Sequence, residues 1–138
     1  MSQAPLDDGP PRVREIDDHV RLSLPARHEY ARIARIGVAA LALRLGFTYR
    51  EIEDLRLAVD ESLIFLLGVD RPGERITIRY VIEPGVLTMT ASASFPTEAD
   101  DDARDRFETL VAELVDSWSS DESAGQVVFT KRHRPPHA

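Results

Sequence analysis

IEDLRLAVDESLIF, residues 52–65, is the stretch that decides how this chain of 138 residues folds. Its apolar side chains recur at steps of three and four residues, which is the spacing of one face of an α-helix. Thr48 followed by Glu51 has the pattern of a capping box, in which each side chain binds the backbone N–H of the other residue. Together these features predict a helix over residues 49–67.

The predicted helix is apolar on two sides. One face carries Leu55, Val59, Leu63 and Leu66. Phe65 lies on another face, and Glu61 precedes it by one turn, so these two side chains project from the same side. One apolar face can pack on a sheet, which leaves the face of Glu61 and Phe65 available for a site.

Alternating and helical patterns surround this helix. Strands are predicted at residues 20–24, 75–82, 86–94, 116–119 and 126–132, and further helices at residues 27–45 and 103–115. Pro84 and Gly85 suit the central positions of a type II turn between two of the strands. The order β-α-α-β-β-α-β-β predicts an α+β fold, with a mixed or antiparallel sheet of about four or five strands and three helices on one face.

Composition narrows the classes of function. Hydrophobic residues make up 43% of the chain and charged residues 30%, which is typical of a globular domain. The chain has no cysteine, which excludes disulfides and thiolate metal sites. A net charge of −7 argues against direct nucleic-acid binding, because phosphate would be repelled. No apolar run is long enough to span a membrane, so we expect no membrane contact and a cytoplasmic location.

The two ends of the chain differ in composition from its middle. Residues 1–17 begin with prolines and charges without periodicity, and we expect a disordered N-terminal arm. Residues 18–132 are expected to form one domain, and residues 133–138 a disordered tail. His133 and His137 have the spacing of two metal ligands on a helix, but the two prolines between them prevent such a helix. No metal site is predicted there.

Three segments resemble the RsbW-type family of anti-sigma factors and serine-protein kinases, which have the GHKL ATPase fold. DLRLAVDE, residues 54–61, is similar to the helix that carries the Glu of that family's Glu-x-x-x-Asn motif. IARIGVAA, residues 33–40, is similar to the family's first helix, and residues 114–131 are similar to its closing hairpin. The resemblance covers about residues 18–133 and implies a GHKL (Bergerat-like) sandwich.

Residues that contact Mg-ATP in the family are replaced in this chain. The resemblance implies that Glu61 is a vestigial general base, while Phe65 stands where Asn holds magnesium. Ser92 and Ser94 stand in a motif that reads Asp-x-Gly-x-Gly in active members. The expected phosphate lid, residues 95–102, has no glycine and four acidic residues, whereas a phosphate cradle needs backbone N–H groups or positive charge. We therefore expect no cofactor, no metal, and a nucleotide pocket filled by Phe65.

The resemblance implies a regulatory binding protein. We predict an anti-sigma factor that binds a sigma factor of RNA polymerase, an STAS-type anti-anti-sigma protein, or both, and that forms a homodimer. Arg35 matches an arginine that family members present to protein partners, and Arg32 lies on the same predicted helix. These two arginines are the candidate partner-binding residues, since arginine suits protein interfaces.

Two alternatives stay open from the sequence. The chain could be an active serine-protein kinase that binds Mg-ATP or Mg-ADP and uses Glu61 to phosphorylate its antagonist. It could also be a pseudo-ATPase that acts as an interaction module or binds another small ligand. The missing magnesium Asn weighs against an enzyme, because phosphoryl transfer depends on the metal. Residues 100–102, three consecutive Asp, favour a solvated charge run over a cation site.

Overall fold

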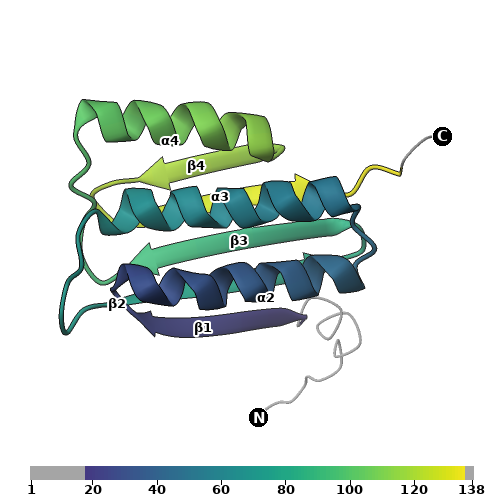
Figure 1. Ribbon diagram of the computed structural model, residues 1–138, viewed down its shortest axis with the longest axis horizontal. Helices are drawn as coiled ribbons and strands as arrows, with labels where there is room; N and C mark the ends of the chain where they lie inside the picture. Colours follow the sequence, from purple (N-terminus) through teal and green to yellow (C-terminus); the bar gives the residue numbers. More distant parts are fainter. Residues whose placement is uncertain (1–17, 136–138) are drawn as a thin grey trace, which may run out of the picture.

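The computed structural model describes residues 18–135. The predicted arm, residues 1–17, and residues 136–138 of the predicted tail lie outside the described residues. The elements, labelled as in Figure 1, are β1 His19–Pro25, the 3-10 helix η2 His28–Tyr30, α2 Ala31–Arg44, α3 Tyr49–Leu67, β2 Arg75–Glu83, β3 Val86–Ala93, α4 Asp101–Leu114, β4 Ser117–Asp121 and β5 Gln126–Arg132. The predicted order of helices and strands is confirmed.

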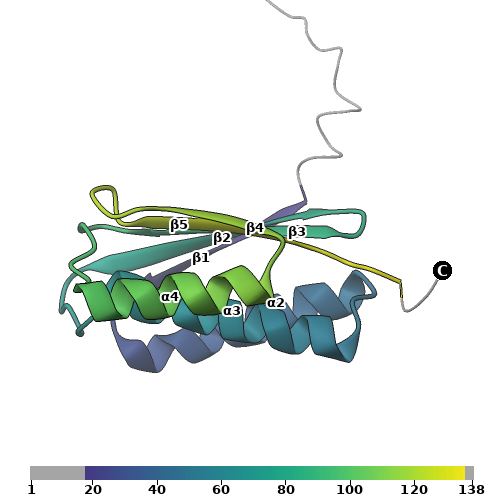
Figure 2. The same ribbon diagram turned by 90° about the horizontal axis from the view of Figure 1, so that it is seen from above.

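Five strands form one antiparallel sheet in the order β1-β2-β3-β5-β4. Helices α2, α3 and α4 all cover the same face of this sheet (Figure 2). Helix α3 lies between the other two in the helical layer (Figure 1). This two-layer α+β arrangement confirms the predicted fold class and is consistent with a GHKL-like sandwich.

The core lies between the sheet and the helical layer. Tyr80, Met89 and Phe129 are neighbours on β2, β3 and β5, and all three are buried. The hydroxyl of Tyr80 donates a hydrogen bond of 2.7 Å to the carbonyl of Ala34 and so attaches α2 to the sheet. Burial raises the pKa of Tyr80, so this hydroxyl stays a donor at neutral pH.

Two helix starts differ from the sequence prediction. The segment expected to begin a helix at residue 27 is first a 3-10 turn, and α2 starts at Ala31. Helix α4 starts at Asp101, two residues before the prediction, because the Asp100 side chain accepts a 2.8 Å hydrogen bond from the N–H of Ala103. Asp100 is thus an N-cap, a position that favours a carboxylate.

The turn between β2 and β3 agrees with its sequence. Gly85 has a φ of 69°, as the second central position of a type II turn requires.

Within residues 18–135, no helix is both long and apolar enough to cross a lipid bilayer.

Candidate functional site

The N-terminus of α3 is fixed by the predicted capping box. Thr48 Oγ1 accepts a hydrogen bond of 3.1 Å from the N–H of Glu51, and the Glu51 carboxylate accepts one of 2.8 Å from the N–H of Thr48. The helix then runs for 19 residues between its two neighbours. Glu61 and Phe65, near its far end, both contact α4.

Phe65 is part of an aromatic cluster under α4. Its ring stacks on Phe107 with a centroid distance of 4.4 Å and an interplanar angle of 10°. Phe107 in turn meets Trp118 of β4 edge-on at 5.6 Å. Phe65 and Phe107 are buried and Trp118 is half-buried. Phe65 therefore packs against α4.

Glu61 forms an ion pair with Arg106 of α4. The guanidinium donates two hydrogen bonds, from Nε to Oε1 at 3.2 Å and from Nη2 to Oε2 at 3.0 Å. The Glu61 side chain is 10% exposed, whereas that of Arg106 is 62% exposed. Hydrogen bonds to Glu61 raise the pKa of Arg106, so its guanidinium is a cation at neutral pH. The carboxylate thus has both its oxygens engaged by one planar cation.

Ser92 and Ser94 lie at the C-terminal end of β3, and both form side-chain hydrogen bonds there. Ser92 accepts a hydrogen bond of 3.2 Å from the side chain of Gln126 on the neighbouring strand. Ser94 accepts one of 3.0 Å from the N–H of Arg75 and donates one of 2.5 Å to Glu74. Each hydroxyl is used by these contacts, which link β3 to its neighbouring strands.

The connection from β3 to α4, residues 94–100, packs closely against the β4–β5 turn. Phe95 is buried, and the guanidinium of Arg71 lies over its ring at 4.4 Å from the centroid. The carbonyl of Phe95 approaches Gly125 so closely that a Cβ at that position would lie 2.2 Å from its oxygen. The backbone of this connection is therefore in close contact with the β4–β5 turn. A mobile lid would need free space at this place.

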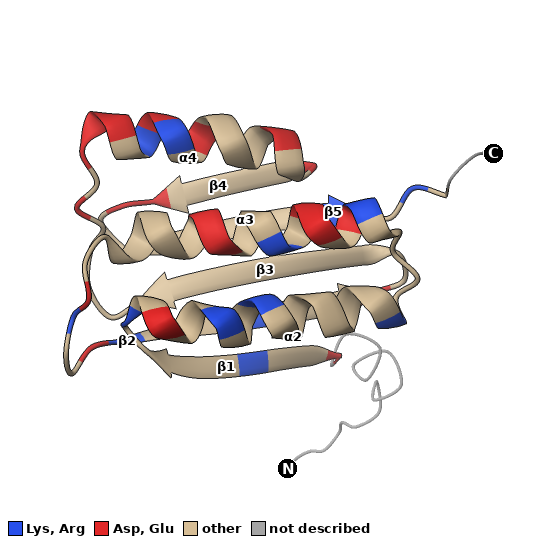
Figure 3. Ribbon diagram, viewed as in Figure 1, with Lys and Arg blue, Asp and Glu red and all other residues tan. Residues whose placement is uncertain are grey.

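Arg104 of α4 forms hydrogen bonds both to this connection and to the β4–β5 turn. Its guanidinium binds both carboxylate oxygens of Glu122 in the β4–β5 turn, at 2.6 and 2.9 Å, and also donates to the carbonyl of Ala99 at 3.1 Å. The N–H of Thr97 donates to the carbonyl of Glu122 at 2.8 Å. Hydrogen bonds from Arg104 lower the pKa of Glu122. Figure 3 shows the acidic first turn of α4 and, after it on the same helix, basic residues.

Arg35 and Arg32 both lie on α2 but differ in their contacts. Arg35 Nη1 donates a 2.6 Å hydrogen bond to Asp60 of α3, and both side chains are 32% exposed. Arg32 is exposed and makes no ion pair with any residue between 18 and 135. Arg35 is therefore held in position by α3, whereas Arg32 projects from the surface.

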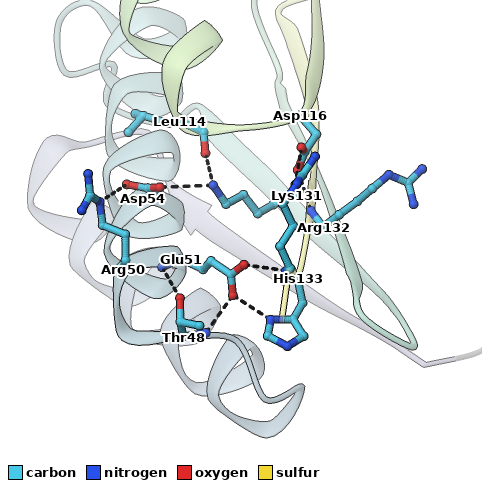
Figure 4. A network of polar contacts seen from close by, with 10 residues as sticks. Thr48, Arg50, Glu51, Asp54, Leu114, Asp116, Lys131, Arg132 and His133 are labelled. Carbon is cyan, nitrogen blue, oxygen red and sulfur yellow. Dashed lines mark hydrogen bonds and ion pairs between the residues drawn. The ribbon is translucent and has the colours of Figure 1, made fainter. Parts of the chain in front are cut away.

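A polar network links the N-terminal half of α3 to β5 and to the residues that follow β5 (Figure 4). Glu51 accepts hydrogen bonds from Nδ1 of His133 at 2.8 Å and from the N–H of Arg134 at 2.7 Å. Lys131 Nζ reaches the carbonyl of Leu114 at 2.7 Å and Asp54 at 3.2 Å. His133 and Arg134, expected at the start of a tail, are thus held against the helix.

No site within residues 18–135 gathers three metal-binding side chains. Of the three consecutive Asp, Asp100 caps α4 and Asp101 pairs with Arg104 at 2.8 Å, so two of these carboxylates serve the start of the helix. Chemically, the region around Glu61 offers one ion-paired carboxylate beside an aromatic cluster.

Sequence reasoning missed the partners of the residues it selected. Nothing in the sequence marked Arg106 or Asp60 as a partner of a site residue. Each is a charged residue on a helix, and the way the helices pack decides which residue it contacts. Phe107 lies within the helix predicted at residues 103–115, but the sequence did not indicate its stacking partner, Phe65. His133 was examined only for metal binding and was not connected to Glu51.

Comparison with known proteins finds sequences that are similar to this chain. No family model matches the chain. The chain is similar to serine-protein kinase RsbW of Bacillus subtilis, with 32% identity over 109 residues that cover 76% of this chain and 55% of that protein. It is also similar to serine-protein kinase RsbW of Listeria monocytogenes strain EGD-e, with 36% identity over 78 residues, 54% of this chain and 50% of that protein. The chain spans about half the length of the curated relatives it matches.

Proposed function

This chain is a distant member of the RsbW/GHKL family, and from that premise we propose that it is a regulatory binding protein. In this proposal it sequesters a sigma factor of RNA polymerase, and an STAS-type antagonist releases the sigma factor by competing for the same surface. No nucleotide takes part. Its working form is a homodimer, which equilibrium sedimentation of the full chain tests directly.

The observation that carries the proposal is the outer face of α2 and α3. Large apolar side chains are exposed there, at Ile33, Ile36, Leu43, Leu57 and Ile64. Ile36 is 61% exposed and Leu57 is 51% exposed, although burying either would be favourable. Arg32 lies one turn before Ile36 on the same helix. Several exposed large apolar side chains with an arginine beside them are typical of a protein–protein interface.

The replaced nucleotide contacts support a function without catalysis. Mg-ATP does not fit the residues present: Phe65 offers no metal ligand and is packed on Phe107. Ser92 is engaged by Gln126, and residues 94–100 are packed against the β4–β5 turn. A triphosphate would also meet the acidic side chains that precede and begin α4.

A direct test measures binding of the purified chain to purified sigma factors and STAS-domain proteins of its own organism. Arg35→Glu should weaken binding at least tenfold, because it reverses the charge at the proposed interface. Arg21→Glu makes the same charge change on β1 and serves as the control, since Arg21 is exposed and alternates with inward-facing Leu22 and Leu24. If no sigma factor binds with a Kd below about 10 µM, a range in which specific complexes fall, the proposal fails.

The second candidate, an active serine-protein kinase, is favoured by one observation, the presence of Glu61 beside α4. A thermal-shift titration with Mg-ATP and Mg-ADP separates the two candidates. Nucleotide at 100 times its Kd would add about 2.7 kcal/mol to the free energy of unfolding. The binding proposal expects no shift, and no transfer of labelled phosphate to an STAS-domain protein. Transfer that is lost in Glu61→Gln would instead establish the kinase.

A further inference from the structure

A cavity of about 220 Å³ lies between the sheet and the α2–α3 pair, away from the Glu61 region. Its floor is made of buried aliphatic side chains, which are Leu24, Leu63, Leu67, Ile76 and Ile78. Ala31 and Ile64 line it from the two helices. We call it the α2–α3 cavity. An apolar cavity of about 150 Å³ is enough to hold a benzene ring, so this one has room for a small molecule.

The α2–α3 cavity also has charged groups in its wall. Arg35, Asp60 and Arg27 all line it, and Arg35 pairs with Asp60 at 2.6 Å. Arg27 lies 3.8 Å from Glu29, and these two side chains are 48% and 60% exposed. Solvent weakens a pair of this kind. With Asp60 neutralised by Arg35, the lining retains one positive charge from Arg27.

Arg35 has donors left for a ligand. Only its Nη1 hydrogen bonds to another residue within the described part of the chain, so Nε and Nη2 have no protein acceptor there. A guanidinium binds a carboxylate best through two parallel N–H groups. Arg35 can therefore keep Asp60 on one nitrogen and receive a second carboxylate on the other two.

We propose that the α2–α3 cavity binds a small monocarboxylic acid with an apolar body, the body against the aliphatic floor and the carboxylate at Arg35. Mostly apolar walls with a few convergent polar groups are the usual form of a small-molecule site. The excess positive charge selects an anion over a neutral molecule of the same shape. The proposal goes beyond the partner-binding function, but the cavity shares Arg35 and Ile64 with the proposed interface. Binding of the small molecule is therefore measured on the chain without any protein partner.

The test uses phenylacetate and its neutral analogue phenylacetamide as probes of the full chain. Titration followed by 1H–15N NMR should show saturable shifts at residues that line the cavity. Phenylacetate should bind at least tenfold more tightly than phenylacetamide, and Arg35→Gln should abolish that preference. Equal affinity of the two probes, or no saturable shift with phenylacetate, would overturn the proposal.

Two variants locate the binding site. Ala31→Leu fills the cavity from α2 and should remove phenylacetate binding, whereas Ala39→Leu, also half-buried on α2 but outside the lining, should bind like the parent. Ile64→Trp blocks the mouth from a side chain that is 41% exposed and so gives a second test should Ala31→Leu not fold. Undiminished binding in a folded blocking variant would place the ligand elsewhere and contradict the inference.

Discussion

Phe65 and Phe107 stack face to face at 4.4 Å and join the middle helix of the layer to α4. Related kinases, by the resemblance, carry a magnesium-binding Asn at the position of Phe65. In this chain the same position contributes to the hydrophobic core, where Phe65 is 4% exposed and Phe107 is 1% exposed. This position thus contributes to packing between α3 and α4.

Phe65→Asn should therefore destabilise the protein without restoring nucleotide binding. It removes a buried aromatic ring and places a polar amide in an apolar contact with the ring of Phe107. We expect a loss of about 3–5 kcal/mol in the free energy of unfolding. Urea denaturation measures the loss, and thermal shift with Mg-ATP measures nucleotide binding.

Phe65→Leu is the control for volume. It keeps the site apolar and should cost less than the Asn variant, about 1–2 kcal/mol. A Phe65→Asn protein as stable as the parent would show that the ring contributes little packing. A Phe65→Asn protein that gains Mg-ATP binding would show that the rest of the nucleotide site is intact.

The fold was predictable because its signals are local. Alternating strands, the capping box at Thr48 and the Pro84–Gly85 turn each depend on a few adjacent residues, and each agrees with the structure. The start of α4 was placed too late because Asp100 and its neighbours were interpreted as a charged loop. The same carboxylates stabilise a helix N-terminus, and this favourable term outweighs their weak intrinsic helix propensity.

Arg106→Met should destabilise the protein more than its own exposure suggests. The substitution leaves Glu61, which is 10% exposed, without its cation. Because Arg106 is 62% exposed and water can partly replace it, we expect a partial loss in the free energy of unfolding, which arises from the buried Glu61 carboxylate. Arg56→Met removes the Arg56–Glu53 pair, whose members are 46% and 35% exposed, and should change stability by no more than about 0.5 kcal/mol.

A double-mutant cycle identifies the origin of that loss. If an unpaired carboxylate is responsible, Glu61→Gln in the Arg106→Met background should recover part of the stability. Additive losses in the two single variants would mean that the ion pair contributes no coupling.

The site was harder to predict than the fold because its contacts join residues far apart in the sequence. Glu61 and Arg106 are 45 positions apart, and Arg35 and Asp60 are 25 apart. Periodicity assigns each residue to a face of its own helix, but it does not set which helix lies beside it or at what register. The resemblance selected Glu61, Phe65 and Arg35, and only the packed helical layer supplies their partners.

The free energy of unfolding should fall at acid pH because the carboxylate of Glu51 becomes protonated. Burial alone would raise its pKa, but hydrogen bonds from the N–H of Arg134, from His133 and from the N–H of Thr48 lower it from 4.5 to about 2. A carboxyl whose pKa is lower in the folded state stabilises that state above its unfolded pKa, and the contribution is lost as pH falls from about 4.5 toward 2. The shift corresponds to at most about 3 kcal/mol.

Glu51→Gln tests this contribution when the free energy of unfolding is measured from pH 7 to pH 2. The difference from the parent should be largest above pH 5 and should shrink toward pH 2. Glu113→Gln, on the exposed surface of α4, should show no such trend. A Glu51→Gln difference that stays constant over the whole range would exclude the ionised form as the source.

Asp116 adds a separate loss of stability in acid. Burial alone would raise its pKa, but hydrogen bonds from Arg132 and Arg134 lower it.

Gly125→Ala should loosen the connection between β3 and α4. Gly125 has a φ of 65°, and an added Cβ would lie 2.2 Å from the Phe95 carbonyl oxygen, so the connection has to move. Gly73→Ala is the matched control, because Gly73 has a φ of 85° and open space around its Cβ position. The control should lose about 1–2 kcal/mol from backbone strain alone, and Gly125→Ala should lose more. Hydrogen exchange should also rise at the N–H of Thr97, which bonds to the Glu122 carbonyl in the same turn. Equal losses in the two variants, with Thr97 unchanged, would show that the contact between Phe95 and Gly125 does not hold the connection in place.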